Sequence, residues 1–513
     1  MIIGRSRQKD QKHPAPEDIL TIWLQNLENH KDRPAVSDAG GLYTYAQLWQ
    51  ESGAIAAGLL DGRSDLEEEA VAFLMDPGFA WVSTLLGIWR AGGMAVPLCI
   101  THPPAELRYA IETTGARRVL AGPSREEQLS FIPVTRLADL AAPAGARLPE
   151  PGPERRAMIL FTSGTTSRPK GVVSTHGIIG TWIRSLQQAW EYRAEDRLLH
   201  FLPLHHLHGV LNKLLVPLAS GARVDMLPRF DPAVVGQHIR DGGYSLFMAV
   251  PTIYTKLIAW MDSLPAAERQ ELAAGFSAMR LMVSGSAALP VPVLERWQQL
   301  TGHFLLERYG MTEIGMAIGN PLHGRRRAGS IGRPLPGVTI RLADEAGREV
   351  PAGEPGEILV QGKGVFLEYW QNPGATTAAF RDGWFLTGDM AVLEDGFYRI
   401  LGRTSVDIIK SGGYKISALE IEEVYRRHPG IKDIAVIGMP DEEWGEVICA
   451  AVLAETGRAP TLEELKDWGK DRLAPYKLPR RMEIPEDFPR NAMGKVMKPE
   501  LKTLFGKEKV QKG

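Results

Sequence analysis

The sequence predicts an α/β protein in which helices cover mainly parallel sheets. Segments with the apolar spacing of helices alternate with short apolar segments typical of buried strands. This alternation is the pattern by which helices connect parallel strands. The chain has 513 residues, more than one compact core usually supports, so at least two domains are expected.

The N-terminal third contains the first predicted elements. Residues 45–60 and 80–91 carry apolar residues at helical spacing, and residues 69–75 and 94–98 are predicted to be buried strands. Residues 158–161 form a further predicted strand. A loop rich in glycine and hydroxyl groups follows it, at the carboxyl end where ligands bind in open α/β sheets.

The pattern of predicted secondary structure changes twice in the second half of the chain. Between residues 330 and 401 the predicted strands are short and the turns frequent, which indicates a small β subdomain. After Asp407 the pattern becomes α+β. We therefore predict a large N-terminal domain (1–401), a boundary at 402–405 and a smaller C-terminal domain (406–513). The C-terminal elements are expected at 417–427 (helix), 434–438 (strand) and 461–473 (helix).

Composition excludes several classes of protein. Hydrophobic residues make up 44% and charged residues 23%, as in soluble globular proteins. A net charge of -2 gives no electrostatic argument for a nucleic-acid partner. Two cysteines, Cys99 and Cys449, exclude a disulfide scaffold and a metal site built from cysteines alone. No apolar run is long enough to span a membrane, and residues 1–18 lack the apolar core of a signal peptide, so a cytoplasmic location is expected.

Residues 161–171, Phe-Thr-Ser-Gly-Thr-Thr-Ser-Arg-Pro-Lys-Gly, form a candidate phosphate loop. Its glycines permit close backbone approach, and its hydroxyls, backbone N–H groups and cations suit a polyphosphate. The loop does not fit the Walker A pattern, and a solvated Ser/Thr/Gly loop remains the alternative. The candidate phosphate contacts are Thr162, Ser163, Gly164, Thr165, Thr166 and Lys170.

Five further motifs follow in order, at residues 307–313 (Glu-Arg-Tyr-Gly-Met-Thr-Glu), 384–389, 402–407, 412–415 and 489–495. Together with the loop they resemble the adenylate-forming superfamily, which includes acyl-CoA synthetases, luciferases and the adenylation domains of peptide synthetases. The resemblance extends from about residue 22 to residue 505. It implies an AMP-forming acid–thiol ligase that uses ATP, Mg²⁺ and coenzyme A to convert a small carboxylic acid into an acyl-AMP and then a thioester.

The resemblance assigns roles in the nucleotide site. Glu313 matches the carboxylate that bridges Mg²⁺, a cation that prefers oxygen ligands. Thr312 matches the α-phosphate contact, and Tyr309 the ring that stacks on adenine. Asp389 matches the carboxylate that accepts both ribose hydroxyls, and Arg403 matches the ribose and phosphate contact. The remaining nucleotide-site candidates are Ser284, Gly285, Ser286, Ala287, Glu307, Arg308 and Gly310.

The same resemblance implies that the C-terminal domain is mobile. It places Lys495 against the substrate carboxylate and the α-phosphate, where a preorganised ammonium stabilises developing charge. After adenylation the domain is expected to turn about a hinge at Ser405, where relatives carry Asp or Lys. The turned face would line the path of the thiol with Lys410, Gly412, Gly413 and Lys415.

Residues 203–209, Pro-Leu-His-His-Leu-His-Gly, indicate what kind of carboxylic acid the pocket accepts. His206 matches the histidine that most family members carry between the acyl pocket and the thiol tunnel. His205 and His208 stand where many fatty acyl-CoA synthetases have aromatic residues, which favours a polar pocket. A metal site is disfavoured here because the i, i+4 spacing of helical metal ligands is absent.

Residues 248–257, 279–284 and 314–317 resemble malonyl-CoA synthetases. A buried dicarboxylate needs its second carboxylate paired, and Arg280 with His208 is the candidate pair, with Met316 closing the pocket floor. Malonate or methylmalonate is therefore the expected acid. A medium- or long-chain fatty acid is one alternative, and an enzyme that loads a carrier protein is another.

Overall fold

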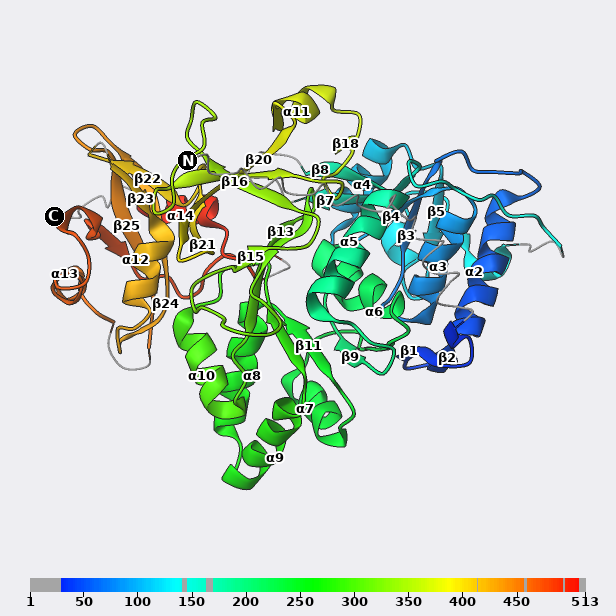
Figure 1. The fold of residues 1–513 in the computed structure, drawn as a ribbon, viewed down its shortest axis with the longest axis horizontal. Coiled ribbons are helices and arrows are strands. Elements are labelled where there is room, and N and C mark those ends of the chain that lie inside the picture. The colour runs from blue at the N-terminus through cyan, green and yellow to red at the C-terminus, as the bar shows by residue number, and fades with distance from the viewer. Residues whose placement is uncertain are drawn as a thin grey trace, which may run out of the picture.

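The structure is a computed structural model of the chain. It describes residues 29–140, 145–162, 169–412, 414–455, 459–491 and 494–506. Figure 1 shows the chain running from a β-rich and helical lobe (blue to cyan), through a second helical lobe (green), to a smaller C-terminal lobe (orange to red). Among the described helices, none is long and apolar enough to cross a membrane.

A seven-stranded sheet forms the first layer, in the order β18-β8-β7-β4-β3-β5-β6. Strands β3 to β7 pair in parallel and β8 and β18 are antiparallel additions at one edge. The bounds are β3 (Ala70–Leu74), β4 (Met94–Pro97), β5 (Arg118–Ala121), β6 (Thr135–Arg136), β7 (Arg156–Thr162), β8 (Lys170–Thr175) and β18 (Glu368–Tyr369).

A nine-stranded sheet forms the second layer, in the order β15-β14-β13-β12-β11-β9-β10-β1-β2. Its centre is parallel, and hairpins at both edges make it mixed. The bounds are β1 (Pro34–Asp38), β2 (Gly41–Thr44), β9 (Arg197–His200), β10 (Arg223–Met226), β11 (Leu246–Ala249), β12 (Leu281–Ser284), β13 (Leu306–Met311), β14 (Gly315–Gly319) and β15 (Arg333–Pro334).

Helices fill the space between these two sheets and cover their outer faces. The central core joins both sheets through α2 (Tyr45–Leu60), α3 (Phe79–Arg90), α5 (His176–Trp190), the π-helix η3 (His208–Leu215) and α6 (Val216–Leu218). The outer face of the first sheet is covered by α4 (Pro104–Thr114). The outer face of the second sheet packs on α7 (Pro232–Asp241), α8 (Pro251–Ser263), α9 (Ala266–Ser277) and α10 (Val291–Thr301).

Local sequence explains where several helices begin. Thr44 caps α2 in a capping box with Gln47, and Thr175 caps α5 by accepting a hydrogen bond from the backbone N–H of Ile178. Such caps satisfy backbone N–H groups that have no partner within the helix.

The small β subdomain is an antiparallel sheet in the order β16-β17-β20-β19, with β21 pairing with β20. Its aromatic core includes Phe366, Tyr369 and Phe385. The bounds are β16 (Thr339–Ala343), β17 (Gly356–Gln361), β19 (Phe380–Arg381), β20 (Trp384–Glu394), β21 (Phe397–Arg403) and, beside it, α11 (Pro373–Ala378).

The C-terminal part has its own sheet, in the order β23-β22-β25-β24, with β26 added to β25. Its elements are β22 (Ile408–Ser411), β23 (Tyr414–Ser417), α12 (Ala418–Tyr425), β24 (Ile431–Asp441), β25 (Gly445–Ala454), α13 (Leu462–Gly469), β26 (Arg481–Glu483) and α14 (Lys498–Phe505). The predicted α/β class, with a large N-terminal part, a β subdomain and a smaller α+β part, is confirmed.

Candidate active site

A cavity of about 330 Å³ lies where the two large sheets, the β subdomain and the C-terminal part meet. Its wall is built from the ends of β7 and β8, the loop after β9, the end of β13 and the β20–β21 region. Lys495 and Asn491 add a wall from the C-terminal part. The structure thus brings together residues that are more than 300 positions apart in the sequence.

The flanks of the predicted phosphate loop reach this cavity. Thr162 and Lys170 pair across β7 and β8, and both line the wall. The Lys170 ammonium lies 4.8 Å from the centre of the Tyr369 ring. Four predicted phosphate contacts lie outside the described residues: Ser163, Gly164, Thr165 and Thr166.

Glu313 and Thr312 follow β13 and line the cavity. The Glu313 side chain is buried, and Tyr369 donates a 2.9 Å hydrogen bond from its hydroxyl to Oε1. Burial raises the pKa of Glu313 above its ordinary value, so a cation beside the carboxylate would stabilise its ionised form. A carboxylate with hydroxyl neighbours is the oxygen-rich donor set that Mg²⁺ prefers, so these residues fit the metal.

Asp389 is held from two sides. Tyr309 donates a 2.7 Å hydrogen bond from its hydroxyl to Oδ2, and Arg403 donates from Nε to Oδ1 at 2.8 Å. The register pairs Asp389 with Arg403 across β20 and β21. Arg403 lines the cavity, whereas Tyr309 and Asp389 join it through these contacts and are not part of the wall.

Arg308 is a buried cation in the cavity wall. It is 3% exposed, and its Nε and one terminal nitrogen have no hydrogen-bond partner among the described residues. Burial lowers its pKa to about 9, so it remains charged at neutral pH. Gly285 makes the position possible, since a Cβ there would lie 2.4 Å from Arg308 Nε. A buried, unpaired guanidinium is costly, and a carboxylate can pair with it in two parallel hydrogen bonds.

His208 lies close to this cation. Its Nδ1 is 3.1 Å from Ser286 Oγ, and both residues line the cavity. Burial first, and then the charge of Arg308, hold the pKa of His208 well below its ordinary value, so the ring is neutral. Gly209 lets the loop turn into η3, because a Cβ there would lie 2.1 Å from the Pro203 carbonyl oxygen.

Arg280 does not lie where the sequence analysis expected it. Its Nε donates a 2.8 Å hydrogen bond to Asp196 Oδ1, and a terminal nitrogen donates to the Trp190 carbonyl oxygen at 3.0 Å. Arg280 precedes β12 and therefore stands at its amino end, whereas the cavity lies at the carboxyl ends of β12 and β13. The prediction that Arg280 pairs with a substrate carboxylate is wrong, and Arg308 is the buried cation that lies beside His208 in the cavity wall.

Of the other two predicted pocket histidines, His206 lines the cavity and His205 does not. Burial lowers the pKa of His206 to about 4. The ring centre of His205 is 4.1 Å from that of His206, and His205 faces Cys99 and His102. The expectation that His205 contacts the substrate is therefore not met.

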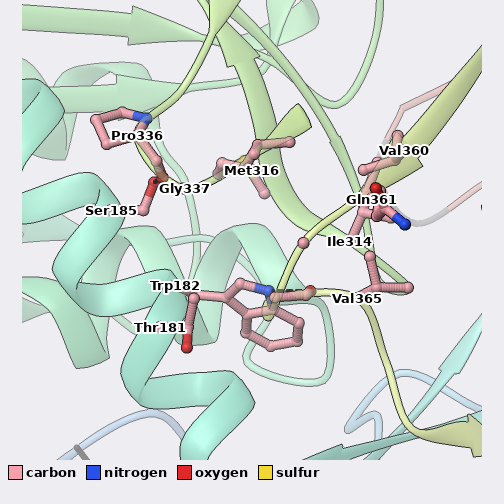
Figure 2. Close-up of a pocket in the computed structure, with 13 residues that line it drawn as sticks. Thr181, Trp182, Ser185, Ile314, Met316, Pro336, Gly337, Val360, Gln361 and Val365 are labelled. Carbon is pink, nitrogen blue, oxygen red and sulfur yellow. Dashed lines mark hydrogen bonds between the residues drawn. The ribbon is translucent and has the colours of Figure 1, made fainter. Parts of the chain in front are cut away.

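Met316 lies in β14 between two cavities. It lines the main cavity and also a small one of about 10 Å³, room for about one water molecule. Figure 2 shows Met316 facing Ile314, Trp182 and the Ser185–Pro336 region across that space. Met316 thus closes one side of the main cavity.

Lys495 reaches the cavity from a tight turn. Its backbone N–H donates a 3.0 Å hydrogen bond to Asn491 Oδ1. Gly494 has a φ of +74°, and a Cβ there would lie 2.8 Å from Thr252 Oγ1 on α8. Glycine therefore allows this turn to approach the N-terminal part closely, with Lys495 in the wall.

The remaining candidates lie elsewhere. Ser284 and Glu307 are buried beside the wall, and Glu307 Oε1 accepts a 2.8 Å hydrogen bond from the Leu289 backbone N–H. Gly310 lines the cavity and Ala287 does not. Lys410, Gly412 and Lys415 lie on the β22–β23 hairpin outside the wall, with Lys415 Nζ 2.6 Å from Glu345 Oε1. Ser405 is exposed between β21 and β22, and Gly413 lies outside the described residues.

Fold and cavity define an adenylate-forming enzyme, and the chain belongs to the AMP-binding enzyme family. Residues 23–370 match the AMP-binding enzyme family, and residues 420–495 match the AMP-binding enzyme C-terminal domain. The prediction of an AMP-forming acid–thiol ligase is therefore confirmed.

The chain is also similar to individual proteins of this family. The chain is 44% identical to the mitochondrial malonate–CoA ligase ACSF3 of Bos taurus, over 93% of this chain and 89% of that protein. It is 39% identical to the malonate–CoA ligase of Arabidopsis thaliana, over 94% and 88%. The crystal structure of ATP-bound MatB from Rhodopseudomonas palustris superposes with a TM-score of 0.86 at 32% identity, over 95% and 99%. That structure supports the predicted use of ATP.

The predicted cytoplasmic location is contradicted by these relatives. The ACSF3 proteins of cattle, mouse and man are each mitochondrial. The expectation was based on the polar character of residues 1–18, and this character does not decide between compartments.

Proposed function

We propose that this enzyme is a malonate–CoA ligase, which converts malonate to malonyl-AMP and then to malonyl-CoA. The observation that carries the proposal is Arg308, a buried cation in the cavity wall with unpaired nitrogens. The free carboxylate of a dicarboxylic acid supplies the partner that Arg308 lacks. The names of the bovine and Arabidopsis relatives point to the same acid.

Two ends of the cavity then have different tasks. Arg308, with the neutral His208 beside it, binds the carboxylate that does not react. Thr312 and Lys495 line the same cavity and meet the carboxylate that does. Because both anions are bound before the reaction, the acid is oriented with one oxygen toward the α-phosphate. Met316 limits how far the acid extends.

The nucleotide side follows from the remaining wall. Thr162 and Lys170 contact the phosphates, together with the loop between them, and Asp389 and Arg403 hold the ribose. The Lys495 ammonium stabilises the charge that develops as the carboxylate oxygen attacks phosphorus. Mg²⁺ held at Glu313 would offset part of the phosphate charge.

Thioester formation uses a second arrangement of the C-terminal part in this proposal. The turn at 404–407 connects β21 to β22, and Ser405 is its exposed residue. Rotation there, between an N-terminal domain of 1–401 and a C-terminal domain of 406–513, withdraws Lys495. It brings the hairpin with Lys410, Gly412, Gly413 and Lys415 toward the acyl-AMP, so that the thiol of coenzyme A can attack.

A panel of acids tests the proposal. AMP release would be measured with ATP, Mg²⁺ and coenzyme A for malonate, methylmalonate, succinate, acetate, butyrate, octanoate and palmitate. We expect the highest kcat/KM with malonate or methylmalonate. A preference for octanoate or palmitate would refute the dicarboxylate pocket. Acyl-AMP formation without transfer to coenzyme A would instead indicate an enzyme that loads a carrier protein.

A further inference from the structure

Three potential metal ligands from two loops meet beside the active-site cavity. Cys99 follows β4, His102 precedes α4 and His205 follows β9. One ligand atom of each lies within 4.8 Å of the other two. We infer that Cys99, His102 and His205 bind one divalent ion of the zinc type, and that this ion slows the ligase.

The donor set decides the class of ion. One thiolate and two imidazoles suit Zn²⁺, whereas Mg²⁺ and Ca²⁺ prefer oxygen. With Zn–N distances of about 2.0 Å and Zn–S of about 2.3 Å, ligand atoms on one ion lie roughly 3.3–3.6 Å apart. Side-chain movements on the order of 1 Å therefore complete the geometry. Three protein ligands leave the fourth position to water.

Two of the three ligands favour the form that binds a metal ion. Burial alone would raise the pKa of the Cys99 thiol, but hydrogen bonds from His102 and Thr101 outweigh it and lower the pKa below its ordinary value. The thiolate that binds metal is thereby favoured. Burial lowers the pKa of His205 to about 2, so its ring is neutral. His205 Nε2 has no hydrogen-bond partner within the part of the chain that the structure describes.

His102 is oriented by a carboxylate. Its Nδ1 lies 3.2 Å from Glu106 Oε2, four residues further on in α4. This contact leaves Nε2 for the ion. The hydrogen bond with Cys99 raises the pKa of His102, so the ion binds Nε2 by displacing its proton. A carboxylate on the far nitrogen is the usual support of a metal-binding histidine. The His102 side chain is 36% exposed, which gives an ion a route from solvent to the buried Cys99.

The position of His205 connects the cluster to catalysis. Its ring centre is 4.1 Å from that of His206, and His206 lines the cavity. An ion on His205 therefore restrains the neighbouring ring in the substrate wall. Slower turnover rests on the proposed ligase function, whereas metal binding does not.

Binding is tested on untagged protein freed of metal with a chelator. Zn²⁺ is titrated by calorimetry, and Co²⁺ by the visible bands of a thiolate-bound ion. We expect one ion per chain, and loss of both signals in Cys99→Ser and His102→Gln. Cys449→Ser is the matched control, because that buried thiol belongs to β25 and is outside the cluster. Glu106→Gln should weaken affinity about 10-fold. Binding by Cys99→Ser equal to the wild type would overturn the inference.

Inhibition is tested by AMP release in excess Mg²⁺, with Zn²⁺ added and then removed by chelation. The wild type should slow and recover, and Cys99→Ser should not respond. Equal inhibition of both proteins would show that Zn²⁺ acts elsewhere and would overturn the regulatory part. A wild type inactive with malonate but with an intact cobalt spectrum would refute the proposed function and support the metal site.

Discussion

Replacing Arg308 with methionine should abolish the preference for a dicarboxylate. Methionine keeps much of the buried side-chain volume and removes the charge from the cavity wall. Leaving the free carboxylate of malonate buried and unpaired costs about 2–5 kcal/mol. At about 1.4 kcal/mol per factor of ten, this corresponds to a loss of roughly 30- to 4,000-fold in kcat/KM for malonate.

Butyrate provides the internal comparison. It has no second carboxylate, so Arg308→Met should leave its kcat/KM unchanged or raise it. AMP release with each acid, at saturating ATP and coenzyme A, gives the two values. Thermal stability should not fall, since the variant removes a buried cation whose Nε and one terminal nitrogen have no hydrogen-bond partner among the described residues. A malonate-to-butyrate ratio equal to that of the wild type would refute the role of Arg308.

Arg280→Met is the matched control. It makes the same substitution at the arginine that pairs with Asp196, away from the cavity. It should lower the unfolding temperature, because it leaves the buried Asp196 carboxylate without its ion pair. Acid selectivity should stay that of the wild type. Loss of malonate selectivity in this variant, with Arg308→Met normal, would reverse the assignment.

Three further predictions concern other parts of the site. Lys495→Ala should lower adenylation, measured by pyrophosphate exchange, by about 10²–10³, while thioester formation from preformed acyl-AMP stays largely intact; equal loss in both half-reactions would contradict the role. Met316→Ala should join the main cavity to the small one behind it. It should therefore raise kcat/KM for malonates with a longer alkyl substituent relative to kcat/KM for malonate. If the ratio of these two values is unchanged, Met316 does not limit the pocket. Burial raises the pKa of Glu307 from 4.5 to about 8, so between these pH values the folded chain binds a proton that the unfolded chain has released, and the stability of the fold falls as pH rises. In Glu307→Gln the unfolding temperature should therefore depend less on pH in this window. Identical pH profiles of the two proteins would show that another group titrates.

Local pattern was sufficient for many elements of the fold. The strands expected at 69–75 and 94–98 are β3 and β4, and the helices expected at 45–60 and 80–91 are α2 and α3 within a residue at each end. Ends set by tertiary contacts were missed. The helix expected at 461–473 ends at Gly469, where a Cβ would lie 2.3 Å from the Tyr425 hydroxyl. The antiparallel additions to the large sheets were also missed, because pairing depends on partners far away in the sequence.

The sequence by itself determined the chemistry. Ordered motifs around Lys170, Glu313, Asp389 and Lys495 resemble those of adenylate-forming enzymes, and the family match confirms that class. Residue types and order within a motif are local properties, so one chain is enough to detect them.

Tertiary structure decided which side chains meet. Arg280 and Arg308 belong to neighbouring strands of one sheet. Arg280 precedes β12 at its amino end, whereas Arg308 lies within β13, one residue beyond the partner of Ser284 at the carboxyl end of β12. Only the second faces the cavity, because parallel strands present all their carboxyl ends on one edge. Likewise, Cys99, His102 and His205 come together because the loops that follow β4 and β9, two strands of different sheets, meet. Contacts between residues this far apart in the sequence depend on how whole sheets pack, so the spacing of residues within a motif does not predict them.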